Sequence, residues 1–234
     1  MTYRNKIRHR MDPNHQTVAP RSAAAQYMIT IMLSLLLWAA WVSAEQSPPV
    51  VLVLGDSLSA GYGIDVSEGW VNLLAERLTA LGYPQRVVNA SISGDTSAGG
   101  LARLPETLAL HHPQIVVIEL GGNDGLRGLP PGHLERNLDA AIQLSRDAGA
   151  QVLLVGIRIP PNFGPVYTEQ IAAVYQNLSD ARNVALVPFL LEGVALEPGM
   201  MQGDGIHPTA AAQPALLDTV WPVLETLLDR ENPN

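Results

Sequence analysis

The sequence contains no cysteine, which excludes disulfides, a cysteine nucleophile, thiolate metal sites and a lipidated amino-terminal cysteine. Aromatic residues are also scarce, at 5% of the chain, although hydrophobic residues of all types make up 47%. The core is therefore expected to consist of leucine, valine, isoleucine and alanine. With 234 residues, the chain has room for one domain with a substantial core and little more.

Lysine is absent from residue 45 onward, and the charges are unevenly distributed. Residues 1–44 contribute +4 to the formal net charge of −8, from five basic residues and one acid. Residues 45–234 contribute −12, from nine arginines and 21 acids. Proteins that bind nucleic acids normally present clustered lysine and arginine. No nucleic-acid partner is therefore expected.

The amino-terminal segment has the features of a secretory signal peptide. A basic region precedes an apolar run at residues 28–42, about fifteen residues long, and small residues follow as far as Ala44. The run is shorter than the ~20 residues that a membrane-spanning helix needs. We expect cleavage after Ala44 to remove residues 1–44 and to release a single domain, residues 45–234, into the periplasm or the medium. The alternative is an uncleaved segment that anchors the domain in the inner membrane.

Short apolar runs alternate with segments of helical periodicity along the rest of the chain. The runs are apolar on both faces, as in a buried sheet, and strands are expected at residues 50–54, 86–90, 115–118, 152–155 and 184–187. Helices are expected at residues 70–81, 98–110, 131–148, 167–178 and 209–228. This alternation predicts an α/β domain with a parallel sheet and right-handed crossovers.

Proline marks three places where regular structure is expected to fail. Pro105 should bend or distort its helix, and Pro222 should kink or divide the last one. Residues 158–164 contain too much proline for regular structure. Residues 188–203 are mixed in character and are expected to form one helical turn followed by loop.

Four polar loops, each with a glycine, interrupt these elements at residues 55–59, 91–96, 121–124 and 204–208. The first three directly follow predicted strands. Because the carboxyl ends of parallel strands meet at one edge of a sheet, and ligands bind in the crevice there, we expect these loops to converge on a site.

Ser57, His207 and Asp204 have the residue types of a hydrolytic triad. A serine hydroxyl is a poor nucleophile until a neighbouring base takes its proton, and His207 is the best-placed base. Asp204 lies three residues earlier, so the two Cβ atoms are expected about 5–6 Å apart, close enough for the carboxylate to orient the imidazole. Pro208 should keep His207 in an extended conformation and occupy the first position of the last helix.

Acyl transfer also needs hydrogen-bond donors for the oxyanion that forms on attack. The candidates are the backbone N–H groups of Ser57 and Gly94 and the side-chain amide of Asn123. Gly94 has no side chain to obstruct a substrate carbonyl. This chemistry requires no metal and no cofactor.

Each of these residues also has a structural interpretation. Asp56 or Ser57 can simply cap the following helix, Asn123 can cap its own, and an isolated histidine such as His207 is more often a surface or capping residue. Asp56 and Asp124 are expected to cap or brace their loops rather than to act as general acids. Three further histidines are expected at exposed positions and not in a metal site: His111, His112 and His133.

The four loops resemble the four motif blocks of the SGNH (GDSL) hydrolase family. The matching residues are Gly-Asp-Ser-Leu at 55–58, the glycine at 94, Gly-x-Asn-Asp at 121–124 and Asp-x-x-His at 204–207. The chain is similar to the bacterial periplasmic subfamily of multifunctional thioesterase I, lysophospholipase L1 and arylesterase over essentially residues 50–228. Four blocks in order at suitable spacing form a highly specific signal.

The resemblance implies a flavodoxin-like three-layer α/β/α sandwich with a five-stranded parallel sheet in the order 2-1-3-4-5. It implies Ser57 as the nucleophile, His207 as the base and Asp204 as its partner, with Ser57, Gly94 and Asn123 forming the oxyanion hole. The implied activity is hydrolysis of acyl thioesters, lysophospholipids and aryl esters through an acyl-enzyme intermediate.

The resemblance and the position of residues 158–164 together suggest an acyl groove. Ile159 and Pro160 are the expected substrate contacts there, and the segment after Asn123 is expected to line the other side. No metal or cofactor is implied, the expected state is a monomer, and membrane contact is expected only through the amino-terminal segment or a lipid substrate.

Two other functions and one other fold are alternatives to this interpretation. A carbohydrate O-acetylesterase can use the same triad, and a non-catalytic lipid-binding domain can retain the same fold. The α/β-hydrolase fold is rejected, because Ser59 stands where its Gly-x-Ser-x-Gly turn has the second glycine, and because the acid and base are adjacent in sequence.

Overall fold

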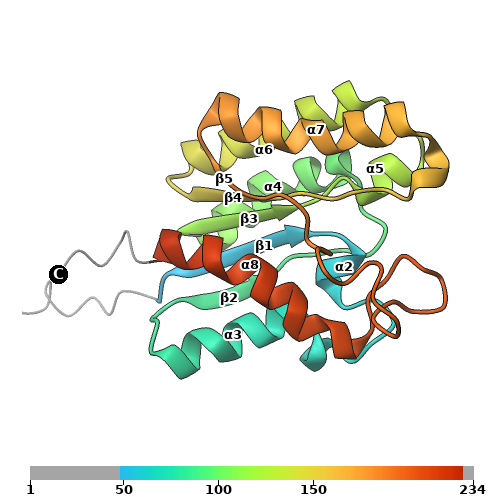
Figure 1. Cartoon of the computed structure of the whole chain (residues 1–234). Helices are drawn as coiled ribbons and strands as arrows, with labels where there is room; N and C mark the ends of the chain where they lie inside the picture. The colour runs from blue at the N-terminus through green and yellow to red at the C-terminus, as the bar shows by residue number, and fades with distance from the viewer. Residues whose placement is uncertain (1–47, 229–234) are drawn as a thin grey trace, which may run out of the picture. The chain divides into compact units, whose positions relative to one another are not determined.

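The computed structural model describes residues 48–228, which are built around a five-stranded parallel sheet (Figure 1). The strands are β1 (Val50–Gly55), β2 (Arg86–Asn89), β3 (Ile115–Glu119), β4 (Gln151–Val155) and β5 (Ala185–Val187). Their order is β2-β1-β3-β4-β5 and all neighbouring pairs are parallel, which confirms the predicted sheet. The predicted signal peptide and its boundary at Ala44 lie outside the described residues.

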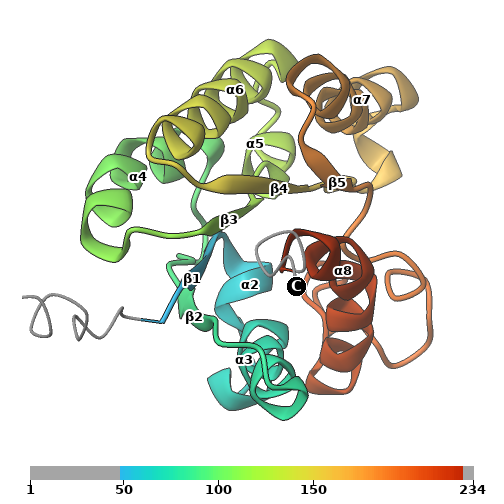
Figure 2. The ribbon, with the colours of Figure 1, turned by 90° about the vertical axis from the view of Figure 1, so that its left-hand side faces the viewer.

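Helices cover both faces of the sheet and complete three layers, as Figure 2 shows. One face carries α4 (Ser97–His111), α6 (Pro131–Asp147) and α7 (Pro165–Arg182). The other face carries α3 (Trp70–Leu81) and α8 (Gln213–Leu228). The predicted three-layer α/β/α arrangement is confirmed.

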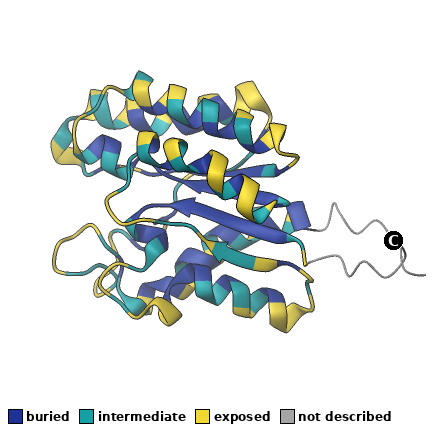
Figure 3. Ribbon diagram, turned by 180° about the vertical axis from the view of Figure 1, so that it is seen from behind, coloured by how far each residue is buried: buried dark blue, intermediate teal, exposed yellow. Residues whose placement is uncertain are grey.

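The sheet is buried because its strands are apolar on both faces. All residues of β1 and β3 are buried, and Leu52 and Val117 have no exposed surface. A parallel sheet with helices on both sides requires such strands. Figure 3 shows the dark, buried strands flanked by helices with exposed outer surfaces. Only the edge strand β2 has exposed ends, at Arg86 and Asn89.

Proline interrupts the helices less than its chemistry alone suggests. α4 continues through Pro105 and α8 through Pro222, so Pro222 does not divide the last helix. In α4, Leu104 and Leu108 are buried on either side of the proline. Such packing supplies most of the stability of a helix in a protein and outweighs one missing backbone hydrogen bond.

The proline-rich segment contains more regular structure than expected. A 3₁₀ turn occupies Pro161–Phe163, and α7 begins at Pro165. The expectation of no regular structure across residues 158–164 was therefore wrong. Proline is accepted in the first turn of a helix, where its missing N–H is not needed, and both prolines lie there.

Within residues 48–228, no helix is both long enough and apolar enough to cross a membrane. The same residues contain no group of three or more histidine, aspartate or glutamate side chains arranged to hold a metal ion.

Candidate active site

The carboxyl ends of β1 and β3 bring two of the predicted loops side by side. Gly55 and Glu119, the last residues of the two strands, are paired in register. Each strand leads into a short helix, α2 (Ser57–Ala60) after β1 and α5 (Gly122–Leu126) after β3. Ser57 and Asn123 therefore both lie in the first turn of a helix at the same edge of the sheet.

The turn after β1 is tightly packed. A Cβ atom at Gly55 would lie 2.8 Å from Glu119 Oε2, so a larger residue does not fit without displacing its neighbours. Asp56 caps α2, because its Oδ1 accepts a hydrogen bond from the backbone N–H of Leu58 at 3.1 Å. The capping role expected of Asp56 is confirmed, and the hydroxyl of Ser57 bonds elsewhere.

Ser57, His207 and Asp204 form a continuous hydrogen-bonded chain. His207 Nε2 lies 2.9 Å from Ser57 Oγ, and His207 Nδ1 lies 2.6 Å from Asp204 Oδ2. An ionised carboxylate only accepts hydrogen bonds, so Nδ1 carries the ring proton and Nε2 accepts from the serine hydroxyl. This is the geometry in which a histidine can activate a serine.

Asp204 is held firmly in its ionised form. Its Oδ2 accepts the imidazole N–H, and its Oδ1 accepts the backbone N–H groups of Ile206 at 2.9 Å and His207 at 3.0 Å. These hydrogen bonds, led by the one from the imidazole, lower the pKa of Asp204 to about 2. The carboxylate therefore stays charged throughout the neutral pH range.

The loop that carries His207 is positioned by pairing with its own neighbours. Pro208 and Met201 form an antiparallel bridge, and His207 O accepts a hydrogen bond from the Gln202 N–H at 2.7 Å. Gln202 Nε2 also donates to the carbonyl oxygens of Tyr62 at 2.8 Å and Pro208 at 2.9 Å. The Tyr62 ring lies against the imidazole, with 4.4 Å between the ring centroids. These contacts connect His207 and its loop to the segment that follows α2.

Pro208 does not begin the last helix, so that expectation was wrong. α8 begins at Gln213, after a 3₁₀ turn at Ala210–Ala212. The Thr209 N–H donates to Met200 O at 2.8 Å, which continues the antiparallel pairing beyond the proline and delays the start of the helix. The proline ring still restricts the backbone of the preceding histidine.

The side-chain amide of Asn123 is held by the nucleophile turn. Asn123 Nδ2 donates to Asp56 Oδ2 at 3.1 Å, and a primary amide has a second N–H for another acceptor. Asp56 is only 2% exposed, and this burial raises its pKa to about 6 although hydrogen bonds oppose the shift. Asn123, Ser57 and His207 all line one groove.

The opposite side of α5 is braced by Asp124. The carboxylate of Asp124 accepts hydrogen bonds from Ser97 N–H at 2.8 Å and from Ser97 Oγ at 2.5 Å. Asn137 Nδ2 donates to the same hydroxyl at 2.9 Å. The bracing role expected of Asp124 is confirmed, and Asn123 is thus held between two hydrogen-bonded carboxylates.

Gly94 lies in a turn near the same edge but is not among the described residues that line the groove. It has φ of 82°, and an added Cβ would meet no atom within 4 Å. The Ile92 N–H donates to Gly55 O at 3.1 Å, which attaches the turn to the end of β1. Arg127 Nη2 donates to Gly94 O at 2.7 Å. The predicted oxyanion donors therefore come from three separate loops.

Sequence reasoning missed Glu119, which lies beneath the nucleophile turn with no exposed surface. Its Oε2 accepts hydrogen bonds from Ser59 Oγ at 2.6 Å and from the Asp56 N–H at 3.4 Å. Burial, followed by the charge of Asp56, raises the pKa of Glu119 well above its usual range. The available signal was an acid within an apolar strand, because a fully buried carboxyl group is rare.

A groove of about 430 Å³ opens beside Ser57. Ile159, Pro160 and Leu126 line it, from the two segments where an acyl groove was expected. A further part of the lining, which the sequence did not predict, comes from the turns after β5: Phe189, Leu191, Ala195, Leu196 and Met201. The available signal was the apolar composition of these turns directly after a strand. Apolar walls with a few polar groups at one end are typical of small-molecule sites.

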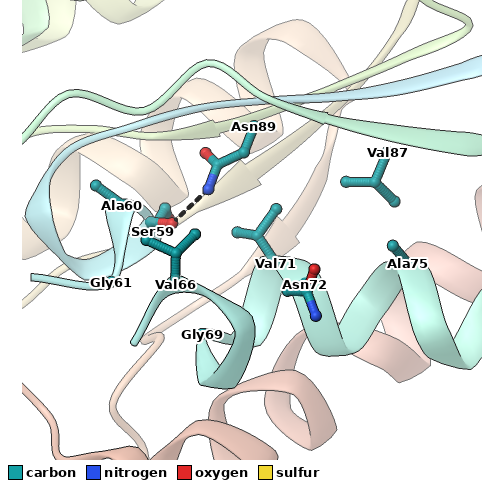
Figure 4. Close-up of a pocket in the computed structure, with 10 residues that line it drawn as sticks. All are labelled: Ser59, Ala60, Gly61, Val66, Gly69, Val71, Asn72, Ala75, Val87 and Asn89. Carbon is teal, nitrogen blue, oxygen red and sulfur yellow. Dashed lines mark hydrogen bonds between the residues drawn. The ribbon is translucent and has the colours of Figure 1, made fainter. Parts of the chain in front are cut away.

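A second pocket, of about 110 Å³, lies behind the nucleophile helix (Figure 4). Residues of α2, α3 and β2 line it, including Val71 and Val87. Asn89 Nδ2 donates to Ser59 O at its edge, at 2.8 Å. This volume holds only a few water molecules, and Ser57 does not line it. The larger groove is therefore the candidate substrate site.

The sequence matches known proteins over most of its length. Residues 53–214 match the profile of the GDSL-like Lipase/Acylhydrolase family. "Esterase TesA" of Pseudomonas aeruginosa is 55% identical over 201 residues, which cover 86% of this chain and 100% of that protein. "Thioesterase 1/protease 1/lysophospholipase L1" of Escherichia coli K12 is 46% identical over 182 residues, covering 78% and 86%. A crystal structure of TesA has a TM-score of 0.75 at 60% identity, covering 76% of this chain and 99% of that one.

Proposed function

Because this chain belongs to the GDSL-like lipase/acylhydrolase family, we propose that Ser57 is the nucleophile with which it hydrolyses carboxylic esters and thioesters. The protein is an ester hydrolase with the SGNH hydrolase fold. The observation that supports Ser57 is the unbroken hydrogen-bonded chain from its hydroxyl through His207 to Asp204.

The first half of the reaction acylates the enzyme. His207 Nε2 takes the hydroxyl proton while Ser57 Oγ attacks the carbonyl carbon. The carbonyl oxygen becomes an oxyanion, which accepts hydrogen bonds from the N–H groups of Ser57 and Gly94 and from the Asn123 amide. The imidazolium, stabilised by Asp204, then protonates the departing alkoxide or thiolate. The bond to the leaving group breaks and Ser57 remains acylated.

The second half releases the acid. A water molecule gives a proton to His207 Nε2 and attacks the acyl carbon, and the same donors stabilise the second oxyanion. When this intermediate collapses, the bond to Ser57 Oγ breaks and His207 returns the proton to the serine. The enzyme is restored and a carboxylic acid leaves. No metal or cofactor takes part in either half.

We propose acyl thioesters, lysophospholipids and aryl esters as the substrates. The apolar groove beside Ser57 supports an acyl chain as the bound half, with Ile159 and Pro160 as contacts. The name of the Escherichia coli relative refers to thioesters and lysophospholipids. Such molecules share an acyl chain and differ in the leaving group, so one apolar groove suits all of them.

Ser57→Ala tests the nucleophile. The variant should lose about 10⁴-fold or more of its turnover with p-nitrophenyl butyrate, because no other group supplies the covalent step. Ser67→Ala is a matched control, since Ser67 is an exposed serine whose hydroxyl donates to the nearby Asp65 Oδ1. Near-ultraviolet circular dichroism checks that both variants fold. Undiminished hydrolysis by folded Ser57→Ala rules the assignment out.

A panel of esters and thioesters with acyl chains from acetyl to palmitoyl tests the substrate class. Activity that rises beyond acetyl supports the groove as an acyl site. Activity that falls sharply beyond acetate indicates the carbohydrate O-acetylesterase instead. Binding of lipid without any hydrolysis indicates a non-catalytic lipid-binding domain.

We propose that the protein is made with a signal peptide, residues 1–44, and acts as a monomeric single domain, residues 45–234, in the periplasm or medium. The basic and apolar composition of the segment supports this. Sequencing of the mature amino terminus should find Glu45, whereas an intact region around residue 28 indicates an inner-membrane anchor. Sedimentation of the mature protein tests the monomer.

A further inference from the structure

The guanidinium group of Arg103, on α4, binds three parts of the nucleophile edge. Its Nε donates to Asp95 Oδ2 at 2.8 Å, its Nη2 donates to Gly55 O at 3.3 Å, and its Nη1 donates to Ala90 O. Gly55 ends the strand before the nucleophile, whereas Ala90 and Asp95 lie on either side of the turn that holds Gly94. One side chain therefore joins the end of β1 to both ends of that turn.

The Gly94 turn has a few other hydrogen bonds. The Ile92 N–H donates to Gly55 O at 3.1 Å, the Asp95 N–H closes the turn on Ile92 O at 3.1 Å, and Arg127 Nη2 donates to Gly94 O at 2.7 Å. Gly94 itself is exposed, with open space where a side chain would be. Packing does not direct its N–H group, so the direction depends on the hydrogen bonds at the two ends of the turn and on the one from Arg127.

Arg103 also neutralises a charge beside the turn. The side chains of Arg103 and Asp95 are only 22% and 13% exposed. A charge-assisted hydrogen bond at such a site is stronger than an ion pair in open solvent. Without Arg103, the Asp95 carboxylate would be left unpaired next to a residue that is proposed to bind an oxyanion. Removing the Arg103 side chain therefore has two separable effects. It frees the Gly94 turn, and it leaves the charge of Asp95 without its partner.

We propose that Arg103 is a positioning residue for the oxyanion hole, which holds the Gly94 N–H group in place through the carbonyl oxygens of Gly55 and Ala90. Arg103 does not touch the substrate in this role. The proposal rests on the proposed function, because it takes Gly94 as an oxyanion donor. A residue needed only for folding would affect stability, whereas a positioning residue affects the transition state more than substrate binding.

Arg103→Met removes all three bonds and is the first test. Its kcat with p-nitrophenyl butyrate should fall about 10- to 100-fold, because small misplacements of catalytic groups have effects of that order, while KM stays within about twofold. The rate of inactivation by a p-nitrophenyl alkylphosphonate, which forms a tetrahedral adduct on Ser57, should fall in parallel. Arg103→Lys keeps the charge and part of the bonding, so it should recover part of the loss.

Arg77→Met is the matched control. Arg77 also binds a carboxylate, Asp218, at 2.6 Å, but it joins α3 to α8 on the other face of the sheet. Its removal should leave kcat within about twofold. Asp95→Asn in the Arg103→Met background separates position from charge, because it removes the unpaired carboxylate but restores no bond to Gly55 or Ala90.

Three results would overturn the proposal. A native kcat in folded Arg103→Met excludes a positioning role. Full recovery of kcat in the double variant with Asp95→Asn also excludes it, because the loss would then be due to the unpaired charge of Asp95. If Arg103→Met fails to fold, a native kcat in Arg103→Lys with an unchanged melting temperature has the same meaning, because an ammonium group lacks the planar fork of donors that makes the three bonds. Failure of the proposed function itself is distinguished by Ser57→Ala, which would then remain active.

Discussion

The two sides of the active-site edge hold their carboxyl groups in opposite ways. On the nucleophile side, residues 55–59 and Glu119 are largely buried, and burial raises the pKa of Asp56 to about 6 and that of Glu119 well above its usual range. On the base side, residues 203–206 are exposed, and hydrogen bonds lower the pKa of Asp204 to about 2. The pKa of an aspartate is therefore raised on one side of Ser57, at Asp56, and lowered on the other, at Asp204.

This difference suits the charges that develop during acyl transfer. The imidazolium on the base side needs a permanent anion, and Asp204 supplies one at every neutral pH. The oxyanion on the nucleophile side is disfavoured by negative charge beneath it, and burial, by raising the pKa values of Asp56 and Glu119, opposes the charged form of both. Carboxyl groups whose environments separate their pKa values are typical of sites that combine acid and base chemistry.

The largest effect on kcat is expected from a change on the base side, at Asp204. Asp204→Asn should lower kcat with p-nitrophenyl butyrate about 10³- to 10⁴-fold, because an amide no longer selects the imidazole tautomer that accepts from Ser57. Asp65→Asn is the control, since Asp65 is also exposed and also has a lowered pKa, owing to hydrogen bonds from Ser67. A loss below tenfold would show that the exposed carboxylate is dispensable and would break the comparison.

The nucleophile side should show the next largest effect. Asn123→Ala should lower kcat about 10²- to 10³-fold, with a smaller change in KM, if the amide is an oxyanion donor. Asn72→Ala serves as the control, because Asn72 makes its side-chain hydrogen bonds on the exposed surface of α3. If turnover falls by much less than tenfold, Asn123 merely holds the turn through Asp56.

Asp56→Asn tests the buried carboxyl group through stability. The folded pKa of about 6 lies above the ordinary 3.8, so the folded state binds more protons between these values. The contribution of Asp56 to the free energy of unfolding is therefore fully present below about pH 4 and is lost as the pH rises through 6. In thermal melts, the melting temperature of the variant relative to that of the native protein should rise by a few degrees between pH 4 and pH 7. A difference that stays constant with pH would contradict the raised pKa.

Asp204→Asn should show the opposite and smaller dependence. A lowered folded pKa gives stability that is present above about pH 4 and is lost as the pH falls towards 2. The native protein should therefore exceed the variant in melting temperature at pH 5, and the two should converge at low pH. Because Asp204 is exposed, solvent screens the effect, and the difference should be smaller than for Asp56→Asn. Parallel melting curves across this range would remove the contrast between the two sides.

Most of the fold and the centre of the site follow from local patterns. The apolar strands predict the sheet, and the polar loops at their ends predict that Ser57 and Asn123 meet at one edge. Asp204 and His207 are three residues apart, so their contact is also local. The order of the strands came from the family resemblance, which also implied the donor roles for which the loops had offered Ser57, Gly94 and Asn123 as candidates.

The rest depends on contacts between distant segments. Glu119 is explained only when its strand is paired with β1 and its carboxyl group meets Ser59. The extended chain at Pro208 depends on Met200 and Met201, which no local rule connects to it. The groove wall after β5 forms because apolar turns fold back over the site, and a sequence pattern does not show which surface a turn will cover.

The hydrogen bond between Ser57 and His207 joins residues 150 positions apart in the sequence. This separation affects when, during synthesis of the chain, the two side chains can meet. Ser57 is synthesised 150 residues before His207, its proposed base, and closing so long a loop carries an entropic cost. A nascent chain that stops short of residue 204 has the serine but neither the proposed base nor its carboxylate partner. On the proposed assignment, hydrolysis cannot begin before residues 204–207 have been made and have packed against Ser57.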